Sequence, residues 1–283
     1  MRTILKVENL VKHFDKKVAV DGINFNIEEG DFIGLLGPNG AGKTTSIKML
    51  TGLIKPDKGK IYYYENIFSR HTPELKKLMG VVPQQSNLDR DLTAHENLYL
   101  HAILHGIPKK WRDAKIDEAL EFAGLADYKK KQVKTFSGGM QRRLVIVRAL
   151  LHEPKILFLD EPTVGLDPQI RHSIWELIIK TNQIKKTAIL LTTHYIEEAE
   201  KLCQKVTIID KGKIIATGLP DLLKKDIGCY VLEIFQEDQI EERFFKTKEE
   251  SLEWIKRSSY PCKVREITLE DVFMKLTGRR INV

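Results

Sequence analysis

The chain has 283 residues, of which 42% are hydrophobic and 30% charged, and its formal net charge is +7. This length suits one large domain with room for a small second one. No apolar run approaches the roughly 18 residues that a membrane-spanning helix needs. The first residues also lack a long apolar segment that ends in small residues, so we expect no signal peptide. These features argue against an integral membrane protein and predict a soluble, cytosolic one.

The positive charge and the cysteines give little guidance to function. Basicity is compatible with nucleic acid, anionic lipid or nucleotide phosphate as partners, and equally with solubility alone. The lysine run at 129–131 is expected to be a solvated surface. The three cysteines are widely spaced and contain no CxxC pair, which favours idle thiols over a metal site or a disulfide framework. They are Cys203, Cys229 and Cys262.

The first third of the chain predicts strands, then a turn, then a helix. Ile23, Phe25 and Ile27 alternate with asparagines, which is the period of a half-buried strand. Residues 32–36, FIGLL, are continuously apolar, as expected for a strand covered on both faces. Residues 43–53 predict a helix, so the glycines between these two segments lie at a strand-to-helix turn.

The middle of the chain predicts a helical insertion in an α/β core. Residues 92–151 are mostly helical in pattern, and residues 155–160, KILFLD, form a second apolar strand. Helices and strands then alternate, which favours a mainly parallel sheet. The expected elements are a helix near 170–180, a strand at 187–193, a helix at 196–202 and strands at 205–210 and 213–218.

After residue 218 the sequence pattern changes, and we expect a small α+β accessory domain at 219–283. Its pattern predicts a strand, a helix, a second strand and a last helix. Thr268 suits the N-cap of that last helix, with Asp271 as its capping-box partner. The larger domain is then 1–218, with a helical subdomain at about 89–151.

The stretch GPNGAGKT at residues 37–44 predicts a phosphate-binding loop. Glycines let successive backbone N–H groups point inward, and the following helix adds its positive N-terminal dipole at the same place. Lys43 is then placed to reach the β- and γ-phosphates, the Thr44 hydroxyl to bind Mg²⁺, and Thr45 to bind another phosphate oxygen. The alternative is a glycine-rich turn without a ligand.

Two acids follow the second apolar strand. Asp160 cannot belong to the core, because an unpaired buried charge is too costly. Ligands of open α/β sheets bind at the carboxyl ends of the strands, so Asp160 should face the glycine loop. We expect Glu161, the next residue, to point elsewhere and to be the better candidate for polarising an attacking water. The alternative is that both acids merely cap the strand.

A second anion-binding nest is predicted in FSGGMQRRL, residues 136–144. Ser137 is a good N-cap, and Gly138 and Gly139 leave the backbone bare at the start of a helix. One nucleotide does not need two nests about a hundred residues apart. An economical interpretation is that the second nest serves the nucleotide of a second copy, with two chains arranged head to tail.

Taken together, these motifs resemble the ATP-binding-cassette (ABC) ATPase family over about residues 3–218. The segments that carry the resemblance, in order, are GPNGAGKT, VVPQQ, FSGGMQRRL, ILFLDEP, VGLDP and TTHY. The resemblance implies an α/β fold: a P-loop NTPase (RecA-like) core with an antiparallel β subdomain and a helical insertion. It also implies hydrolysis of ATP with Mg²⁺.

The resemblance also implies roles for single residues. Lys43, Glu161, His194 and Gln84 would be catalytic, with Glu161 as the base and His194 at the γ-phosphate. Magnesium would be held by Thr44, Gln84 and Asp160. The nucleotide would contact Phe14 through its adenine, the loop through its phosphates, and the partner's second nest and Asp167 across the dimer interface. The implied binding residues are Phe14, Gly37, Pro38, Asn39, Gly40, Ala41, Gly42, Lys43, Thr44, Thr45, Ser137, Gly138, Gly139 and Asp167.

Some alternatives stay open at this point. Phe14 could belong to the core, and a single histidine such as His194 would ordinarily be structural. The other seven histidines have no comparable context, and we assign them no function. They are His13, His71, His95, His101, His105, His152 and His172.

An ABC-like ATPase sequence without membrane-spanning segments implies the ATPase subunit of a transporter. Such a subunit would be bound to a separate permease at the cytoplasmic face of the inner membrane. The permease contact is expected near residues 87–100, beside the Gln84 loop. VVPQQSNLDRDLTAHENL, THYIEEAE and TLEDVFMKLTGR are similar to the exporter branch for drugs, lipids and lipooligosaccharides. The alternative is a soluble ABC ATPase acting on ribosomes or DNA. A single cassette with a short insertion argues against that alternative, so we expect no nucleic acid partner.

Overall fold

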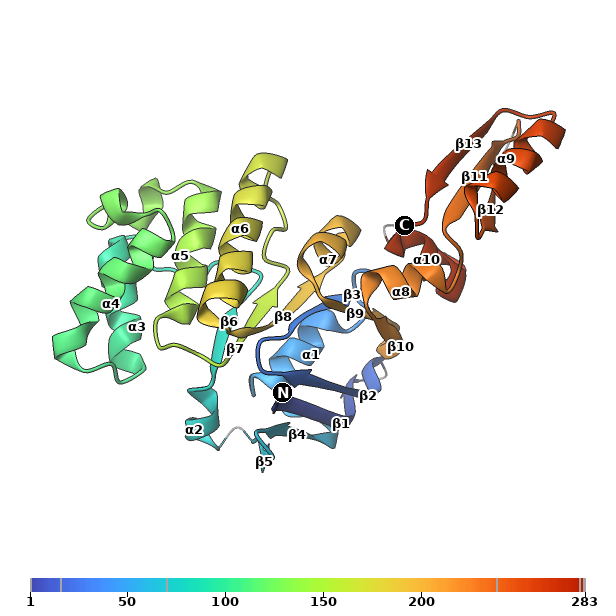
Figure 1. The fold of residues 1–283 in the computed structure, drawn as a ribbon. Coiled ribbons are helices and arrows are strands. Elements are labelled where there is room, and N and C mark those ends of the chain that lie inside the picture. The colour runs from blue at the N-terminus through green and yellow to red at the C-terminus, as the bar shows by residue number, and fades with distance from the viewer. Residues whose placement is uncertain (1, 16, 70, 238, 280, 282–283) are drawn as a thin grey trace.

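A computed structural model of the chain describes residues 2–15, 17–69, 71–237, 239–279 and 281. Its centre is a six-stranded sheet with the order β10-β9-β3-β8-β7-β6 (Figure 1). The neighbouring strands run parallel except for β10, which is antiparallel to β9. The strands are β3 (Phe32–Leu36), β6 (Met79–Val82), β7 (Ile156–Asp160), β8 (Ala188–Thr193), β9 (Lys205–Asp210) and β10 (Lys213–Gly218).

The central strands are buried on both faces, which explains their continuous apolar runs. Every residue of β3, β7 and β8 is buried. Alternate residues of β7 enter two different hydrophobic clusters: Leu157 and Leu159 pack with the helical insertion, whereas Ile156 and Phe158 pack on the other side. The covering helices are α1 (Lys43–Leu50), α6 (Pro168–Lys185) and α7 (Ile196–Leu202).

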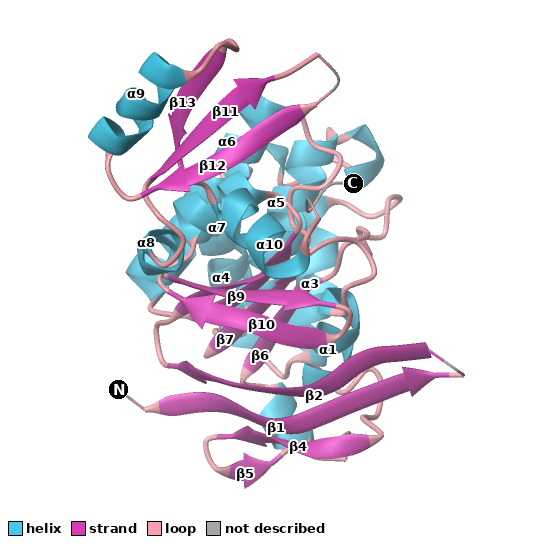
Figure 2. Cartoon of the chain, turned by 90° about the vertical axis from the view of Figure 1, so that its right-hand side faces the viewer, coloured by secondary structure: helices cyan, strands magenta, loops and turns pink. Residues whose placement is uncertain are grey.

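An antiparallel sheet packs on the α1 side of the core and completes the predicted class (Figure 2). Its order is β2-β1-β4-β5, and β2 shows the predicted alternation, with Ile23 and Ile27 buried and Asn24 and Asn26 exposed. Its strands are β1 (Thr3–Phe14), β2 (Lys17–Glu28), β4 (Lys58–Tyr63) and β5 (Asn66–Ile67). The α/β cassette fold expected from the sequence is confirmed.

The helical insertion leaves the core after β6 and returns to it at β7 (Figure 1). Thr93 and Glu96 form a capping box that starts its first long helix, and Ser137 caps its last. The insertion contains α3 (Ala94–Leu104), α4 (Lys109–Phe122), the short 3₁₀ turns η1 (Ala126–Tyr128) and η2 (Val133–Thr135), and α5 (Gly138–Leu150). A short helix, α2 (Pro73–Lys76), precedes β6.

The C-terminal unit is a three-stranded sheet with the order β12-β11-β13, flanked by helices. The predicted capping box of Thr268 and Asp271 is present. Within this unit, two elements were not predicted from the sequence. Helix α8 is short, and β12, IEERFF, lacks a strand-like alternation because three charged residues follow one another. The elements are α8 (Pro220–Lys225), β11 (Tyr230–Phe235), β12 (Ile240–Phe245), α9 (Lys248–Arg257), β13 (Cys262–Glu266) and α10 (Leu269–Thr277).

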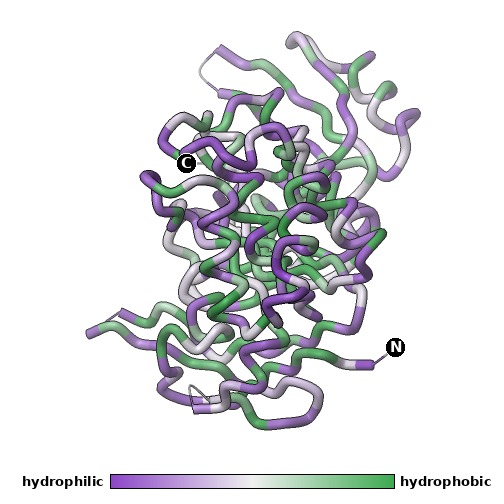
Figure 3. Tube along the Cα trace, turned by 90° about the vertical axis from the view of Figure 1, so that its left-hand side faces the viewer, coloured by the Kyte–Doolittle hydropathy of each residue, from purple (hydrophilic) through white to green (hydrophobic). Residues whose placement is uncertain are grey.

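This unit shares its hydrophobic core with the cassette. Leu223 of α8 and three residues of α10 belong to the same cluster as the insertion and the central sheet. The α10 residues are Leu269, Val272 and Phe273. Figure 3 shows the apolar segments gathered in the middle of the molecule and the polar ones along its outer loops. Within the described part of the chain, no helix is both long enough and apolar enough to cross a membrane.

Replacing Phe273 with alanine tests this shared core. Phe273 is fully buried, so its loss should lower the free energy of unfolding by about 3–5 kcal/mol. Urea unfolding followed by circular dichroism would measure it. Leu276→Ala, on the exposed side of the same helix, should cost less than about 1 kcal/mol. Equal effects of the two changes would contradict a shared core.

Candidate active site

A pocket of about 370 Å³ opens where the carboxyl ends of β3 and β7 meet the start of α1. This volume suits a nucleotide-sized ligand. The lining comes from the end of β1, the start of β2, the glycine loop, the segment after β6 and the residue after β7, as the switch-point rule for α/β sheets predicts. The lining residues are Phe14, Lys17, Ala19, Asn39, Gly40, Gly42, Lys43, Thr44, Thr45, Gln84 and Glu161.

The glycine loop has a shape that other residues cannot take. Gly42 has a φ of 107°, and a Cβ there would lie 2.4 Å from the carbonyl oxygen of Ala19. A Cβ on Gly37 would lie 2.2 Å from the carbonyl oxygen of Ile209. Among the described residues, no side chain caps the first turn of α1. Its N–H groups therefore suit an anionic ligand, as the sequence predicted.

Lys43 lies across this loop with its charge almost out of solvent. The residue is 4% exposed, and Nζ donates hydrogen bonds to the carbonyl oxygens of Gly37 at 2.8 Å and Pro38 at 3.1 Å. Nζ also lies 3.1 Å from Oε1 of Glu161. Burial lowers the pKa of Lys43, and the Glu161 carboxylate opposes that change. A phosphate would offer this ammonium the same kind of oxygen partner.

Asp160 faces the loop, as predicted. Its Oδ1 accepts hydrogen bonds from the hydroxyl of Thr44 at 3.0 Å and from the hydroxyl of Thr192 at 2.7 Å. Thr192 lies on β8, next to β7 in the sheet, so two strands and the start of α1 hold one carboxylate. A carboxylate beside a hydroxyl is a donor set that fits a hard cation such as Mg²⁺.

The expectation that Glu161 points away from this centre was wrong. Its Oε1 lies 3.3 Å from Nδ1 of His194 as well as beside Lys43, and its Oε2 accepts a hydrogen bond from Gln84 at 3.0 Å. The reason is a backbone φ of 45°, which breaks the alternation of an extended strand after Asp160. Both acids therefore face one centre, and Gln84 and His194 reach the same carboxylate.

Phe14 lies at the rim of the pocket and does not belong to the core. It is 48% exposed, which excludes the core alternative. The ammonium of Lys12 lies 5.6 Å from the centre of its ring. The ring is thus an accessible flat surface beside the loop, suited to stacking on a base.

The second nest does not join this pocket within one chain. Ser137 caps α5, since its Oγ accepts a hydrogen bond from the backbone N–H of Met140 at 3.3 Å. Asp167 likewise caps α6 through the N–H of Ile170 at 2.9 Å. Neither residue, nor Gly138 or Gly139, is among the described residues that line the pocket.

Arg142 is a site residue that sequence reasoning missed. Its buried guanidinium donates to the carbonyl oxygens of Pro162 and Pro83, each at 2.6 Å, and of Asp160 at 3.3 Å. A weaker bond reaches the carbonyl of Gln84 at 3.4 Å. Burial lowers the pKa of Arg142 to about 10, so it stays charged at neutral pH. The sequence feature that could have indicated its role is a charged arginine on the otherwise apolar face of a helix.

A phosphate loop between a buried strand and a helix, with an acid at the end of a neighbouring strand, defines a P-loop nucleotide-binding protein. The sequence profile of the family described as "ABC transporter" matches residues 20–164. The chain belongs to the ABC transporter family, as one of its ATP-binding, ATP-hydrolysing subunits.

Relatives of known name match almost end to end. The chain is 41% identical to the Nod factor export ATP-binding protein I of Burkholderia pseudomallei (strain K96243), covering 97% of each chain. It is 39% identical to the protein of the same name from Ralstonia nicotianae, covering 98% of this chain and 95% of that one.

Solved structures match the cassette. CbiO1 of Clostridium perfringens, part of the complex cbiONQ, aligns with a TM-score of 0.72 and 30% identity, covering 77% of this chain and 89% of that one. The ATP-binding cassette MJ0796, solved as a post-hydrolysis dimer with ADP and Pi, aligns with a TM-score of 0.68 and 29% identity. That alignment covers 76% of this chain and 98% of MJ0796.

Arg142→Met tests the hydrogen bonds that Arg142 donates to the backbone around Asp160 and Glu161. The change leaves several buried carbonyl oxygens without their donor, so it should lower the free energy of unfolding by about 3 kcal/mol. Urea unfolding would measure it. Arg143→Met is the matched control, because Arg143 is less buried and should tolerate the change. Equal stability of both variants would contradict a stabilising role for the hydrogen bonds of Arg142.

Proposed function

We propose that this chain powers export of an oligosaccharide-type molecule through a separately encoded permease. The relatives named for Nod factor export support this proposal, because the chain aligns with nearly their whole length. The observation that carries the ATPase part is the convergence of Lys43, Asp160 and Glu161 on one glycine loop. We also propose the sequence-based division into a cassette at 1–218 and an accessory unit at 219–283.

In this proposal Glu161 is the general base. Its carboxylate already gathers three partners that a catalytic centre needs: Lys43, Gln84 and His194. When phosphate oxygens replace Glu161 as the partner of the Lys43 ammonium, Oε1 of Glu161 becomes free to accept a proton from the attacking water. His194, on the other side of the same oxygen, is placed to donate to the γ-phosphate.

Mg²⁺ is the proposed cofactor, held by Thr44, Asp160 and Gln84. The hydroxyl, carboxylate and carboxamide oxygens form a hard donor set, and two of the three already contact each other at 3.0 Å. Such an ion neutralises charge on the β- and γ-phosphates. The protein holds Thr44 and Asp160 next to each other, and the hydroxyl of Thr192 orients the Asp160 carboxylate through a hydrogen bond.

Two copies are proposed to share each nucleotide. Ser137, Gly138 and Gly139 form an anion-binding helix start outside the chain's own pocket, which is what a partner's γ-phosphate would need. Asp167, beside the same surface, would cross the dimer interface. The dimeric state of the similar cassette MJ0796 supports this arrangement.

The permease is proposed to dock near residues 87–100, which would place the protein at the cytoplasmic face of the inner membrane. Leu100 is 50% exposed, and Ile103 and Leu104 on the same helix are also exposed. Gln84 joins this segment to the active site through its contact with Glu161. Recovery with an integral membrane protein from solubilised membranes would support this proposal, whereas recovery with ribosomes or DNA would overturn it.

Glu161→Gln should abolish steady-state hydrolysis while ATP stays bound, because the amide keeps the shape but cannot accept the proton. The trapped nucleotide should hold a dimer on size-exclusion chromatography. Phosphate release and elution volume are the measurements. His71→Asn changes an exposed residue that is not among the described pocket-lining residues, and it serves as the unchanged control. Normal turnover of Glu161→Gln would exclude Glu161 as the base.

Lys43→Ala should weaken binding of a fluorescent ATP analogue by roughly tenfold or more, because the phosphates lose their main counter-ion. Fluorescence titration with and without Mg²⁺ would measure it. Lys17→Ala, at the rim of the same pocket, should have a smaller effect. Unchanged affinity and activity of Lys43→Ala would contradict its proposed role.

A further inference from the structure

Three histidines that the sequence left without a function converge at one place. His101 lies in the last turn of α3, His105 is the C-cap of that helix, and His152 lies in the turn after α5. One ring nitrogen of each lies within 4.8 Å of one ring nitrogen of the other two. The rings of His105 and His152 stack with centroids 3.8 Å apart, and those of His101 and His105 are 4.3 Å apart.

Two nitrogens of this cluster are buried without a hydrogen bond. Nε2 of His101 and Nδ1 of His152 have no partner among the described residues. Nε2 of His152 lies 3.1 Å from the carbonyl oxygen of Met79 on β6. A carbonyl only accepts, so this contact places the ring proton on Nε2 and leaves a lone pair on Nδ1. Metal-binding histidines are commonly oriented by such a contact.

Burial of the cluster disfavours the charged form of all three imidazoles. Burial lowers the pKa of His101 to about 3 and that of His152 to about 4, and it also lowers that of His105. A neutral imidazole is the form that coordinates a metal ion. Two buried ring nitrogens with no hydrogen-bond partner are otherwise a cost to the fold.

We propose that His101, His105 and His152 form a binding site for a divalent transition-metal ion, for which Zn²⁺ is the probe. Three nitrogens around a tetrahedral ion lie roughly 3.3 Å apart, so the present spacing needs only a small inward rotation of the rings. The stacked rings of His105 and His152 would splay as they turn. Water would take the fourth position.

The surroundings decide which ions the site can take. Among the residues that the structure describes, no carboxylate belongs to the cluster, so imidazole-preferring ions such as Zn²⁺, Ni²⁺ or Cu²⁺ are favoured over Mg²⁺. Arg148 is the nearby positive charge, and it opposes any cation beside His101. Its guanidinium is engaged by Asn87, donating to the backbone carbonyl at 3.0 Å and to the side-chain oxygen.

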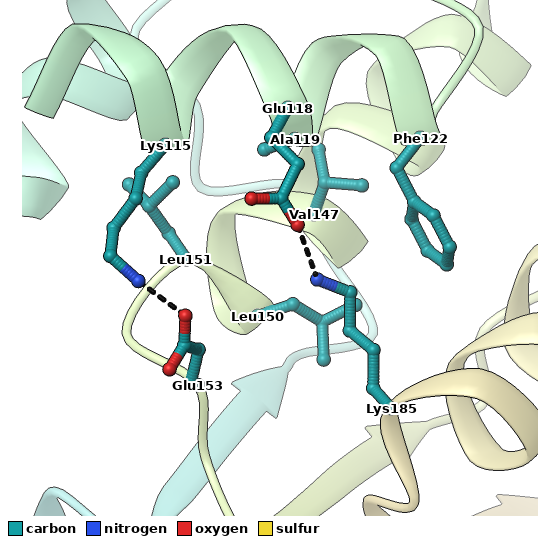
Figure 4. A pocket seen from close by; sticks show the side chains of 9 residues that line it. All are labelled: Lys115, Glu118, Ala119, Phe122, Val147, Leu150, Leu151, Glu153 and Lys185. Atoms are coloured by element: carbon teal, nitrogen blue, oxygen red, sulfur yellow. Dashed lines mark hydrogen bonds and ion pairs between the residues drawn. The ribbon is translucent and has the colours of Figure 1, made fainter. Parts of the chain in front are cut away.

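An ion pair and an apolar contact link the turn that carries His152 to α4. Figure 4 shows Glu153 pointing at Lys115 of α4 and forming an ion pair with it, while Leu151 packs beside them. Lys185 of α6 pairs with Glu118 in the same hollow at 3.3 Å. A bound ion would join the end of α3 to a turn that is hydrogen-bonded to β6.

Isothermal titration of the nucleotide-free, Mg²⁺-free full chain with Zn²⁺ tests the proposal. We expect one ion per chain. His101→Asn and His152→Asn should each weaken binding by roughly tenfold or more. His71→Asn, an exposed histidine outside the cluster, is the matched control and should bind as the parent does. Equal affinity of all four proteins, or no Zn²⁺ binding by the parent, would overturn the site.

Absorption of the Co²⁺-loaded protein separates this site from the cysteines. Bands of a tetrahedral ion without thiolate charge transfer would support the histidine site, and thiolate charge transfer would overturn it. Should His101→Asn or His152→Asn fail to fold, His105→Asn repeats the test. His105 is less buried, and the loss of Co²⁺ bands in that folded variant is the expected result, whereas their persistence would overturn the proposal.

Discussion

The buried ion pair of Lys43 and Glu161 is the interaction around which the active site is organised. Two opposite charges removed from water are costly unless each keeps further partners, and here both do. Loop carbonyls hold the ammonium, and Gln84 and His194 hold the carboxylate. The pair can exist because parallel strands β3 and β7 end at one edge of the sheet. In the proposed function, phosphate oxygens would replace those of Glu161 around Lys43.

The same centre is tied to the helical insertion through Gln84 and Arg142. The side chain of Gln84 bonds Glu161, while its backbone carbonyl bonds Arg142 of α5. Arg142 in turn holds the carbonyls of Pro83, Asp160 and Pro162, which belong to the segments after β6 and around the end of β7. A single residue, Gln84, thus connects the carboxylate of Glu161 to α5, the last helix of the insertion.

Much of the fold and part of the site could be predicted from the sequence. Buried strands gave continuous apolar runs, and the spacing of the glycines and Lys43 is typical of a phosphate-binding turn. The orientation of Glu161 could not be predicted, because it depends on one backbone angle after β7. The histidine cluster was also out of reach. His101 and His105 share the spacing of one helical turn, but His152 joins them only through tertiary packing.

The seating of α10 on the cassette has a consequence for attempts to shorten the protein. Its apolar face covers part of the main core, and the N–H of Leu269 bonds the carboxylate of Glu200 on α7 at 3.0 Å. Arg279 reaches back to Asp210 at the end of β9 at 2.5 Å. A chain ending at residue 218 would expose a hydrophobic patch where α8 and α10 now pack, and it would be prone to self-association. The C-terminal unit is thus part of the packing of the cassette, and its removal would uncover apolar core residues.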